Sequence, residues 1–157
     1  MSAKPLPEGA PRVIPMLVCR DPGAEADFCK AAFRAEERVR RPAPDGSVAH
    51  VLVTIGTAMV MIEGVFPTYA ASRAPEDDAS SPVVLYVYIE DVDQAVARAV
   101  AAGAKVLIPV ADQFWGDRTG RIIDPSGHVW IVATRIEETT AEERQKRWSD
   151  TVEGKKA

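Results

Sequence analysis

The chain has 157 residues, enough to bury one hydrophobic core or two small halves that share one. Its 46% hydrophobic and 27% charged residues are typical of an ordinary globular protein, and its apolar runs are too short to span a membrane. The net charge is −4 and the lysines and arginines are scattered, which argues against a nucleic-acid partner.

The N-terminal stretch and the cysteines favour a cytoplasmic protein. Residues 1–12 contain no apolar segment of the kind found in a secretory signal. Cys19 and Cys29 are the two cysteines, and neither has a CxxC partner or a neighbour at metal-ligand spacing. Because no export signal is present, we expect both thiols to be reduced.

The first half of the chain predicts a strand, a helix and three more strands. Residues 1–11 contain three prolines and a glycine and predict a flexible arm. Asp21 is a good helix N-cap and Pro22 suits the first helical turn, so a helix is expected from there to about Ala35. Its apolar stripe is expected to consist of Ala24, Phe28, Ala31, Ala32 and Phe33. The strands are expected at residues 13–19, 36–41, 47–55 and 57–63.

A linker at residues 65–82 separates this half from a second one, and its EDDASSP segment is acidic and turn-forming. Asp91 then caps a helix at residues 92–102, which Gly103 ends. The Asp124-Pro125-Ser126-Gly127 segment predicts a turn, because proline fixes φ and glycine accepts positive φ. Strands are expected at residues 83–89, 105–110, 119–123 and 128–133. Within the last residues, 136–157, Thr140 and Glu143 predict a capping box for a charged helix at about 140–149.

The two halves repeat the same order of elements. A shift of 70 residues sets Asp21 on Asp91, so the two capping aspartates coincide. The same shift places the first strand of one half on the first strand of the other. The sequence identity is weak, but strand, capping aspartate, helix and strands recur in step. An internal repeat therefore explains the chain better than two unrelated halves.

Several local motifs in this order resemble the vicinal oxygen chelate superfamily, and most closely its glyoxalase/bleomycin-resistance-like or PhnB-like branch. The motifs are DGSVAH at 45–50, IGTAMVM at 55–61, IEDVD at 89–93, FWGDR at 114–118 and DPSGHVW at 124–130. Each motif alone is loose, and their order and spacing carry the resemblance. The superfamily includes lyases, isomerases, dioxygenases and non-catalytic binders, so the resemblance does not give the function.

The resemblance implies an α+β fold over residues 12–135, with two tandem βαβββ modules at about 12–64 and 83–135. The modules are expected to form a cupped mixed sheet with the helices on its outer face, and two chains are expected to form a homodimer. The alternation of residues along each strand then predicts which side chains face the helix and which face the cup. Val51, Val53 and Ile55 are expected to face the helix, and His50 and Leu52 the cup.

The resemblance also implies four metal-ligand positions, one on each of four strands, which are His, Glu or Gln in metal-using members. In this chain they fall on Ile14, Met61, Val84 and Ile131. Three aliphatic side chains and a thioether are poor ligands for the divalent ions that such sites hold. We therefore expect no metal and no other cofactor, with a partial site at Glu63 and His50 as the alternative.

The expected ligand contacts are on the cup-facing strands and on the FWGDR loop at the rim. They are His50, Leu52, Met61, Tyr86, Tyr88, Phe114, Trp115, Arg118 and Ile131. Arg118 is expected to hold an anionic oxygen, or else to form a structural turn with Asp117. If the protein is an enzyme, the candidate catalytic residues are His50, Glu63, Tyr86 and Arg118. His128 and Trp130 are expected to face the helices and to hold the fold.

Three functions are consistent with this pattern. The first is a binding protein of the bleomycin-resistance type, which sequesters a small, partly apolar molecule in a metal-free cup. The second is a metal-independent lyase or isomerase that acts on a small oxygenated substrate. The third is a metalloenzyme whose ligands lie elsewhere. The residues do not decide between them.

Overall fold

The computed structural model describes residues 5–65, 73–76 and 81–154. The start of the predicted arm, most of the predicted linker at 65–82, and residues 155–157 lie outside the described residues. The chain divides into two compact units. Unit 1 consists of Met1–Ala79 with Pro125–His128, and unit 2 consists of Ser80–Asp124 with Val129–Ala157.

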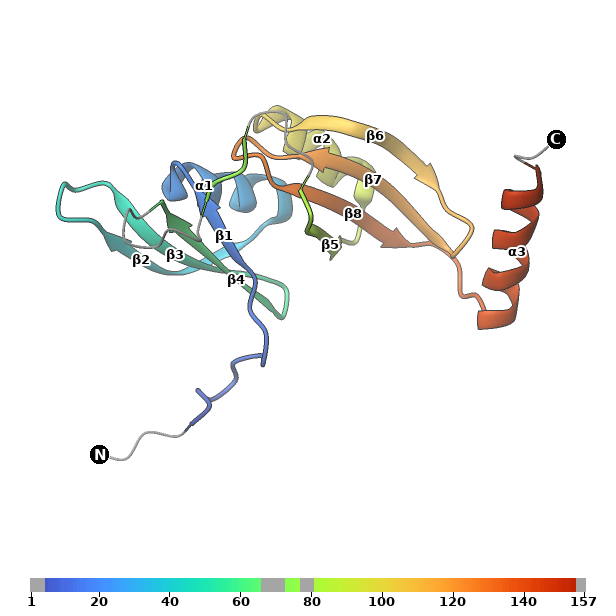
Figure 1. Ribbon diagram of the computed structural model, residues 1–157, viewed down its shortest axis with the longest axis horizontal. Helices are drawn as coiled ribbons and strands as arrows, with labels where there is room; N and C mark the ends of the chain where they lie inside the picture. The colour runs from blue at the N-terminus through green and yellow to red at the C-terminus, as the bar shows by residue number, and fades with distance from the viewer. Residues whose placement is uncertain (1–4, 66–72, 77–80, 155–157) are drawn as a thin grey trace. The chain divides into compact units, whose positions relative to one another are not determined.

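Each unit contains a four-stranded mixed sheet and a helix that follows its first strand (Figure 1). The strand orders are β1-β4-β3-β2 and β5-β8-β7-β6. In each unit the first strand therefore lies beside the fourth, followed by the third and the second. The first and last strands of each unit pair in parallel, and the other neighbours pair antiparallel. The fold is therefore α+β with two repeated βαβββ modules, as the sequence repeat predicted.

In unit 1, a short capped helix follows an edge strand. The elements are β1 (Met16–Cys19), α1 (Pro22–Phe33), β2 (Glu36–Pro42), β3 (Val48–Ile55) and β4 (Ala58–Gly64). The Asp21 side chain accepts a hydrogen bond of 3.0 Å from the Ala24 amide, which confirms the predicted N-cap. The first strand begins three residues later than predicted, because Pro15 has no N–H to donate; its carbonyl accepts a bond from the Met61 amide instead.

The core of unit 1 lies between α1 and one face of its sheet. Val51, Val53 and Ile62 are fully buried there, as the predicted alternation requires. The helix stripe differs in part from the prediction, because Ala24 and Ala31 are exposed. The buried stripe is instead Glu25, Ala26, Phe28, Cys29, Ala32 and Phe33, positions that recur at helical spacing on the side toward the sheet.

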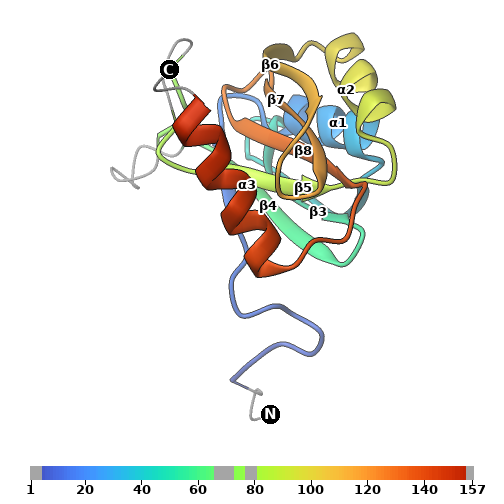
Figure 2. The ribbon, with the colours of Figure 1, turned by 90° about the vertical axis from the view of Figure 1, so that its right-hand side faces the viewer.

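In unit 2, the strands are of similar length to those of unit 1 and the helix is shorter. The elements are β5 (Val84–Tyr88), α2 (Val92–Ala101), β6 (Lys105–Asp112), β7 (Asp117–Ile123) and β8 (Val129–Arg135), followed by α3 (Ala141–Gly154). Figure 2 shows α2 beside this sheet and α3 apart from α2. The Asp91 side chain accepts a 3.0 Å bond from the Gln94 amide, so the second predicted N-cap is also confirmed.

The core of unit 2 lies under α2 and contains Ile122, Trp130 and Val132. The Trp130 indole N–H donates to Oδ2 of Asp124 at 2.7 Å, which ties the buried ring to the turn that precedes its strand. A side chain at Gly120 would meet Val96 of α2, so this part of β7 lies directly against the helix. Trp130 therefore holds the fold, as predicted.

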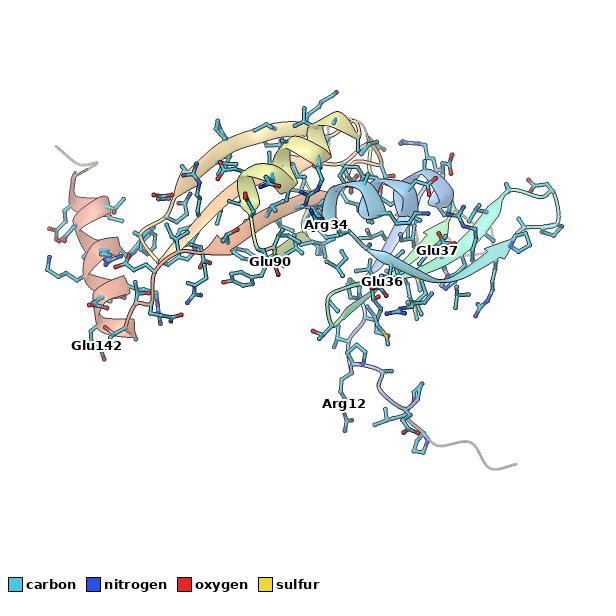
Figure 3. All side chains as sticks on the ribbon, turned by 180° about the vertical axis from the view of Figure 1, so that it is seen from behind. Arg12, Arg34, Glu36, Glu37, Glu90 and Glu142 are labelled. Carbon is cyan, nitrogen blue, oxygen red and sulfur yellow. The ribbon has the colours of Figure 1, made fainter. Side chains whose placement is uncertain are left out.

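The C-terminal helix begins at a capping box. The Thr140 amide donates to Glu143 at 2.7 Å and the Glu143 amide donates back to the Thr140 hydroxyl at 3.1 Å. Figure 3 shows Glu142 in the first turn, where negative charge is favourable. The helix runs to Gly154, beyond the predicted end near residue 149. None of the helices in the described part of the chain is long and apolar enough to cross a membrane.

Candidate functional site

The face of the unit 2 sheet that points away from α2 carries aromatic and charged side chains. Strand register puts Tyr86 and Arg121 on either side of Ile131, because each pairs with it across β5–β8 and β7–β8. Two residues further along, Tyr88 pairs with Ala133 in the same way. Tyr86 and Tyr88 are 42% and 54% exposed, so this face is accessible on unit 2 itself.

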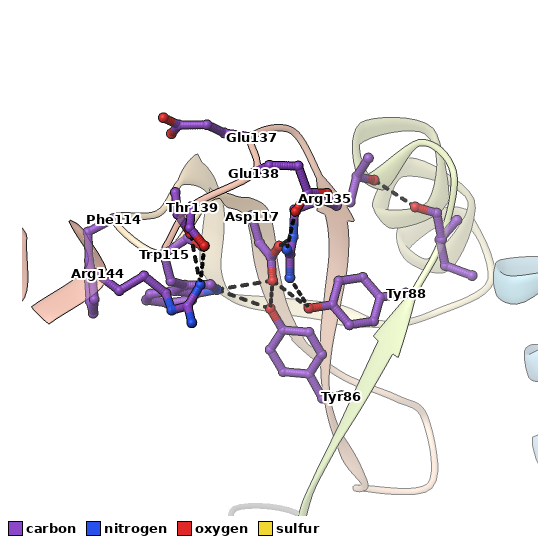
Figure 4. A network of polar contacts seen from close by, with 12 residues as sticks. Tyr86, Tyr88, Phe114, Trp115, Asp117, Arg135, Glu137, Glu138, Thr139 and Arg144 are labelled. Atoms are coloured by element: carbon purple, nitrogen blue, oxygen red, sulfur yellow. Dashed lines mark hydrogen bonds and ion pairs between the residues drawn. The ribbon is translucent and has the colours of Figure 1, made fainter. Parts of the chain in front are cut away.

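A buried carboxylate organises this face (Figure 4). Asp117 is only 1% exposed, and its Oδ2 accepts hydrogen bonds from the hydroxyls of Tyr86 and Tyr88 at 2.7 and 2.8 Å. The Trp115 indole N–H donates to the same oxygen at 3.1 Å. Arg135 donates to Oδ1 at 2.5 Å, and its guanidinium carbon lies 5.9 Å from the centre of the Tyr88 ring. Three rings are thus fixed around one charge.

The environment of Asp117 holds it in the charged form. Burial raises the pKa of the Asp117 carboxyl, but the hydrogen bonds from the two tyrosines and from Arg135 outweigh it, and the net pKa is lowered. Burial, together with the hydrogen bond to the carboxylate, raises the pKa of Tyr86 well above its usual 10. Tyr86 therefore stays protonated at neutral pH and is a poor general base.

The hydrogen bonds to Asp117 also limit how the two tyrosines can bind a ligand. Each hydroxyl hydrogen already points to Asp117, so the hydroxyls of Tyr86 and Tyr88 retain only acceptor capacity. The rings lie 5.2 Å apart between centroids and are tilted by 52°. A ligand would therefore meet a fixed aromatic surface, and neither hydroxyl would be free to donate a hydrogen bond to it.

A small cavity of about 140 Å³ lies on this face of unit 2. Its lining comes from β6, β7, β8 and the loop before β7, and consists of Ile108, Gln113, Trp115, Thr119, Arg121 and Ile131. Two of these residues, Trp115 and Ile131, were predicted as ligand contacts, and the structure brings them together. The cavity is smaller than the usual small-molecule site of about 300–1,000 Å³.

The face of the unit 1 sheet that points away from α1 has a different chemistry. His50 and Glu63 are register partners on β3 and β4, and His Nδ1 lies 3.2 Å from Glu Oε1. Their side chains are 13% and 29% exposed. Leu52 pairs with Met61 next to them, on the same face. The structure thus brings together the three predicted ligand contacts of the first module and the candidate catalytic residue Glu63 as one half-buried patch.

Arg118 does not belong to the aromatic face. It pairs with Thr134, and its guanidinium binds Asp93 of α2 and Asp112 of β6 at 2.8 to 2.9 Å. The prediction of Arg118 as a ligand contact or catalytic residue is therefore corrected, since strand alternation turns it toward the helix. The predicted structural turn of Asp117 with Arg118 is also wrong, because Asp117 pairs with Arg135 instead.

Phe114 packs on two aromatic neighbours. Its ring meets Trp115 edge to face at 4.9 Å and lies 5.4 Å from the ring of Trp148 on α3. It joins α3 to the loop that carries Trp115, and it is not among the residues that line the cavity. His128 bonds the Val18 carbonyl at 3.1 Å and lies 3.6 Å from the Cys19 thiol, both in unit 1.

The four positions expected for metal ligands do not fit a divalent ion. Ile14 precedes β1, and Met61, Val84 and Ile131 lie on strands, so only a thioether and alkyl groups are present there. Within the described ranges, no three or more His, Cys, Asp or Glu side chains gather where they could hold a metal ion. His50 and Glu63 form a pair without a third ligand of these types. The donor set is thus unlike that of a zinc or manganese site.

Three residues of the candidate site were not predicted from the sequence. Asp117 was taken as part of a turn, and Arg135 and Arg121 were not considered. The alternation of β7 could have identified Asp117 and Arg121. The buried Ile122 points to one face of the sheet, and the side chains at 117, 119, 121 and 123 point to the other. Placing two charged residues on that face would have indicated a polar site.

Known proteins with related sequences and structures agree with this architecture. Residues 13–132 match the Glyoxalase/Bleomycin resistance protein/Dioxygenase superfamily. An uncharacterized protein of Mycobacterium bovis is 34% identical over 146 residues, which are 92% of this chain and 96% of that protein. TioX from Micromonospora sp. ML1 has a TM-score of 0.63 at 27% identity, covering 81% of this chain and 100% of TioX.

A more distant structure shares the fold. The fosfomycin resistance protein FosX from Listeria monocytogenes has a TM-score of 0.57 at 20% identity, over 86% of this chain and 94% of that one. The repeated modules, the common strand order and the match over most of the sequence lead to one conclusion. The chain belongs to the Glyoxalase/Bleomycin resistance protein/Dioxygenase superfamily.

Proposed function

We propose that this protein binds a small, partly apolar molecule on the aromatic face of unit 2 and holds it without converting it, as in drug sequestration. The observation that carries the proposal is the set of rings fixed around Asp117, beside a cavity lined by Trp115 and Ile131. A rigid aromatic surface binds a flat ligand at low entropic cost, because its side chains are already ordered.

The chemistry of this face favours binding over catalysis. Tyr86 has a raised pKa and its proton is engaged by Asp117, so it neither accepts nor readily releases a proton at neutral pH. Asp117 is buried with a lowered pKa and is surrounded by its own four donors. Within the described part of unit 2, the polar groups of this network are used to hold the rings in place.

The experiment is a thermal-shift screen of drugs and metabolites, followed by recovery of each stabilising compound and its analysis by mass spectrometry. Sequestration predicts a ligand that raises the melting temperature and is recovered unchanged. Trp115→Ala should abolish the shift because the indole lines the cavity. Trp148→Ala is the matched control, since Trp148 is half exposed on α3 and lies outside the cavity lining. A shift that persists in Trp115→Ala would show that the ligand binds elsewhere.

One observation favours a second function, that of a metal-independent lyase or isomerase. His50 and Glu63 form a cross-strand pair in unit 1 with Nδ1 and Oε1 3.2 Å apart, on a face that remains partly exposed. A carboxylate that orients an imidazole is a common arrangement for a general base. For this function the recovered compound would be chemically altered. Its conversion would be lost in His50→Gln and retained in Trp148→Ala.

A further inference from the structure

Arg121 differs from the other two arginines of the β7–β8 region. The Arg118 guanidinium is bound by Asp93 and Asp112, and Arg135 is bound by Asp117. Arg121, in contrast, forms no hydrogen bond or ion pair with any residue in the described ranges, and its Nε is buried from solvent. A buried donor without an acceptor destabilises a fold, so an arginine in this position calls for an explanation.

The surroundings of Arg121 show where an acceptor would lie. Arg121 is one of the residues that line the 140 Å³ cavity, with the Trp115 indole and the side chains of Ile108 and Ile131 forming apolar walls. Thr119 and Gln113 add a hydroxyl and an amide to the same lining. The guanidinium therefore lies where an aromatic surface and two neutral polar groups meet.

Among the described residues of this face, the charge of Arg121 has no acidic partner. Asp117, the buried carboxylate of the network, is engaged by Arg135 at 2.5 Å and by three neutral donors. Among the described residues that line the cavity, none has an acidic side chain. A guanidinium with apolar walls around it binds an oxyanion more strongly than one in water, and its planar fork matches a carboxylate.

We infer that Arg121 is an anion-binding residue, and that the ligand of this face is a flat aromatic or apolar molecule that carries a carboxylate. The inference rests on the proposed function and names its ligand class. The cavity is too small for a whole drug-sized molecule, so it takes the carboxylate end. The apolar body of the ligand lies over the adjoining Trp115 and Tyr86 rings.

The test is isothermal titration calorimetry with 2-naphthoate and its neutral analogue 2-naphthamide. Wild-type protein should bind the carboxylate about 10- to 100-fold more tightly than the amide, the range expected for hydrogen bonds to a charged group. Arg121→Gln should remove this difference, and Arg121→Lys should retain part of it, because lysine keeps the charge without the fork.

Arg118→Gln is the matched control, because it removes an arginine three residues away on the opposite face of the same strand. It should leave the preference for the carboxylate unchanged. Arg121→Gln should also leave the melting temperature of the ligand-free protein unchanged or higher, since no bond within the described part of the protein is lost. A fall of several degrees would show that Arg121 is structural and would overturn the inference.

The outcomes separate this inference from the proposed function. Equal binding of naphthoate and naphthamide, both lost in Trp115→Ala, would overturn the role of Arg121 and leave the binding function standing. A preference for naphthoate that survives in Arg121→Gln would place the anion site elsewhere. If the compound screen finds no molecule whose effect depends on Trp115, the proposed function fails first, and the inference fails with it.

Discussion

Replacing Asp117 by asparagine tests whether one carboxylate organises the aromatic face. The amide oxygen can take the place of Oδ2 toward the two tyrosines and Trp115, but the NH₂ group then points at the guanidinium of Arg135. The variant therefore loses the ion pair and changes three hydrogen bonds to a charged acceptor into bonds to a neutral one.

The cost follows from those contacts. Bonds to charged groups contribute about 1.5–3 kcal/mol and neutral ones about 0.5–1.5, so each of the three bonds weakens by about 1 kcal/mol. Arg135 is 42% exposed and can turn to water, so the loss of its ion pair adds little to this cost. A neutral amide is easier to bury than a carboxylate, which offsets part of the loss. We expect the free energy of unfolding to fall by about 2–4 kcal/mol.

Urea unfolding followed by tryptophan fluorescence measures this change in unit 2 alone. All three tryptophans, Trp115, Trp130 and Trp148, lie in that unit. Asp112→Asn is the control, because Asp112 is an exposed partner of Arg118 and its loss should leave the unfolding midpoint close to that of wild type. An Asp117→Asn midpoint within experimental error of wild type, at an unchanged m-value, would refute the view that Asp117 holds the rings together.

Three further predictions follow from the same structure. The pKa of Asp117 is lower in the folded protein than its value of about 3.8 in the unfolded chain. The charged carboxylate therefore stabilises the fold fully above that pH, and this stabilisation is lost as the pH falls through the folded-state pKa. Wild type and Asp117→Asn should thus converge in stability below about pH 4. Gly116→Ala should cost about 2 kcal/mol or more, measured as a lower melting temperature, since φ is +93° and the new methyl would lie 2.5 Å from the Glu137 carbonyl. We also propose a homodimer, because Val83 and Val84 are exposed at the edge strand β5. Light scattering should give twice the 17.0 kDa of one chain, and a monomer at micromolar concentration would contradict the proposal.

The elements of the fold could be read from the sequence because their signals are local. Asp21 and Asp91 each cap a helix through a side-chain bond to an amide three residues later, and this needs no knowledge of the rest of the chain. The alternation of β3 likewise assigned Val51 and Val53 to the buried face. The prediction of the buried helix stripe was less accurate, because alanine occurs on both the buried and the exposed side of a helix.

The candidate site depended on long-range pairing, which local signals do not contain. Arg118 looked like a rim residue in the sequence, but the register of β7 turns it to Asp93 of α2, 25 residues away. Arg135 lies beyond the strand that was expected at residues 128–133, and only the fold brings it to Asp117. Both outcomes depend on which strands lie side by side and in what register.

The sequence by itself determined the repeated βαβββ order and the helix caps, since these follow from residue type and from spacing along the chain. The apolar residues at the expected metal positions were identified through the family resemblance. Only the tertiary structure decided which arginine of β7 and β8 is left without a partner among the described residues and which carboxylate is enclosed. A charge is satisfied or unsatisfied according to what the folded chain brings within about 3 Å of it. Distance along the chain does not set that separation.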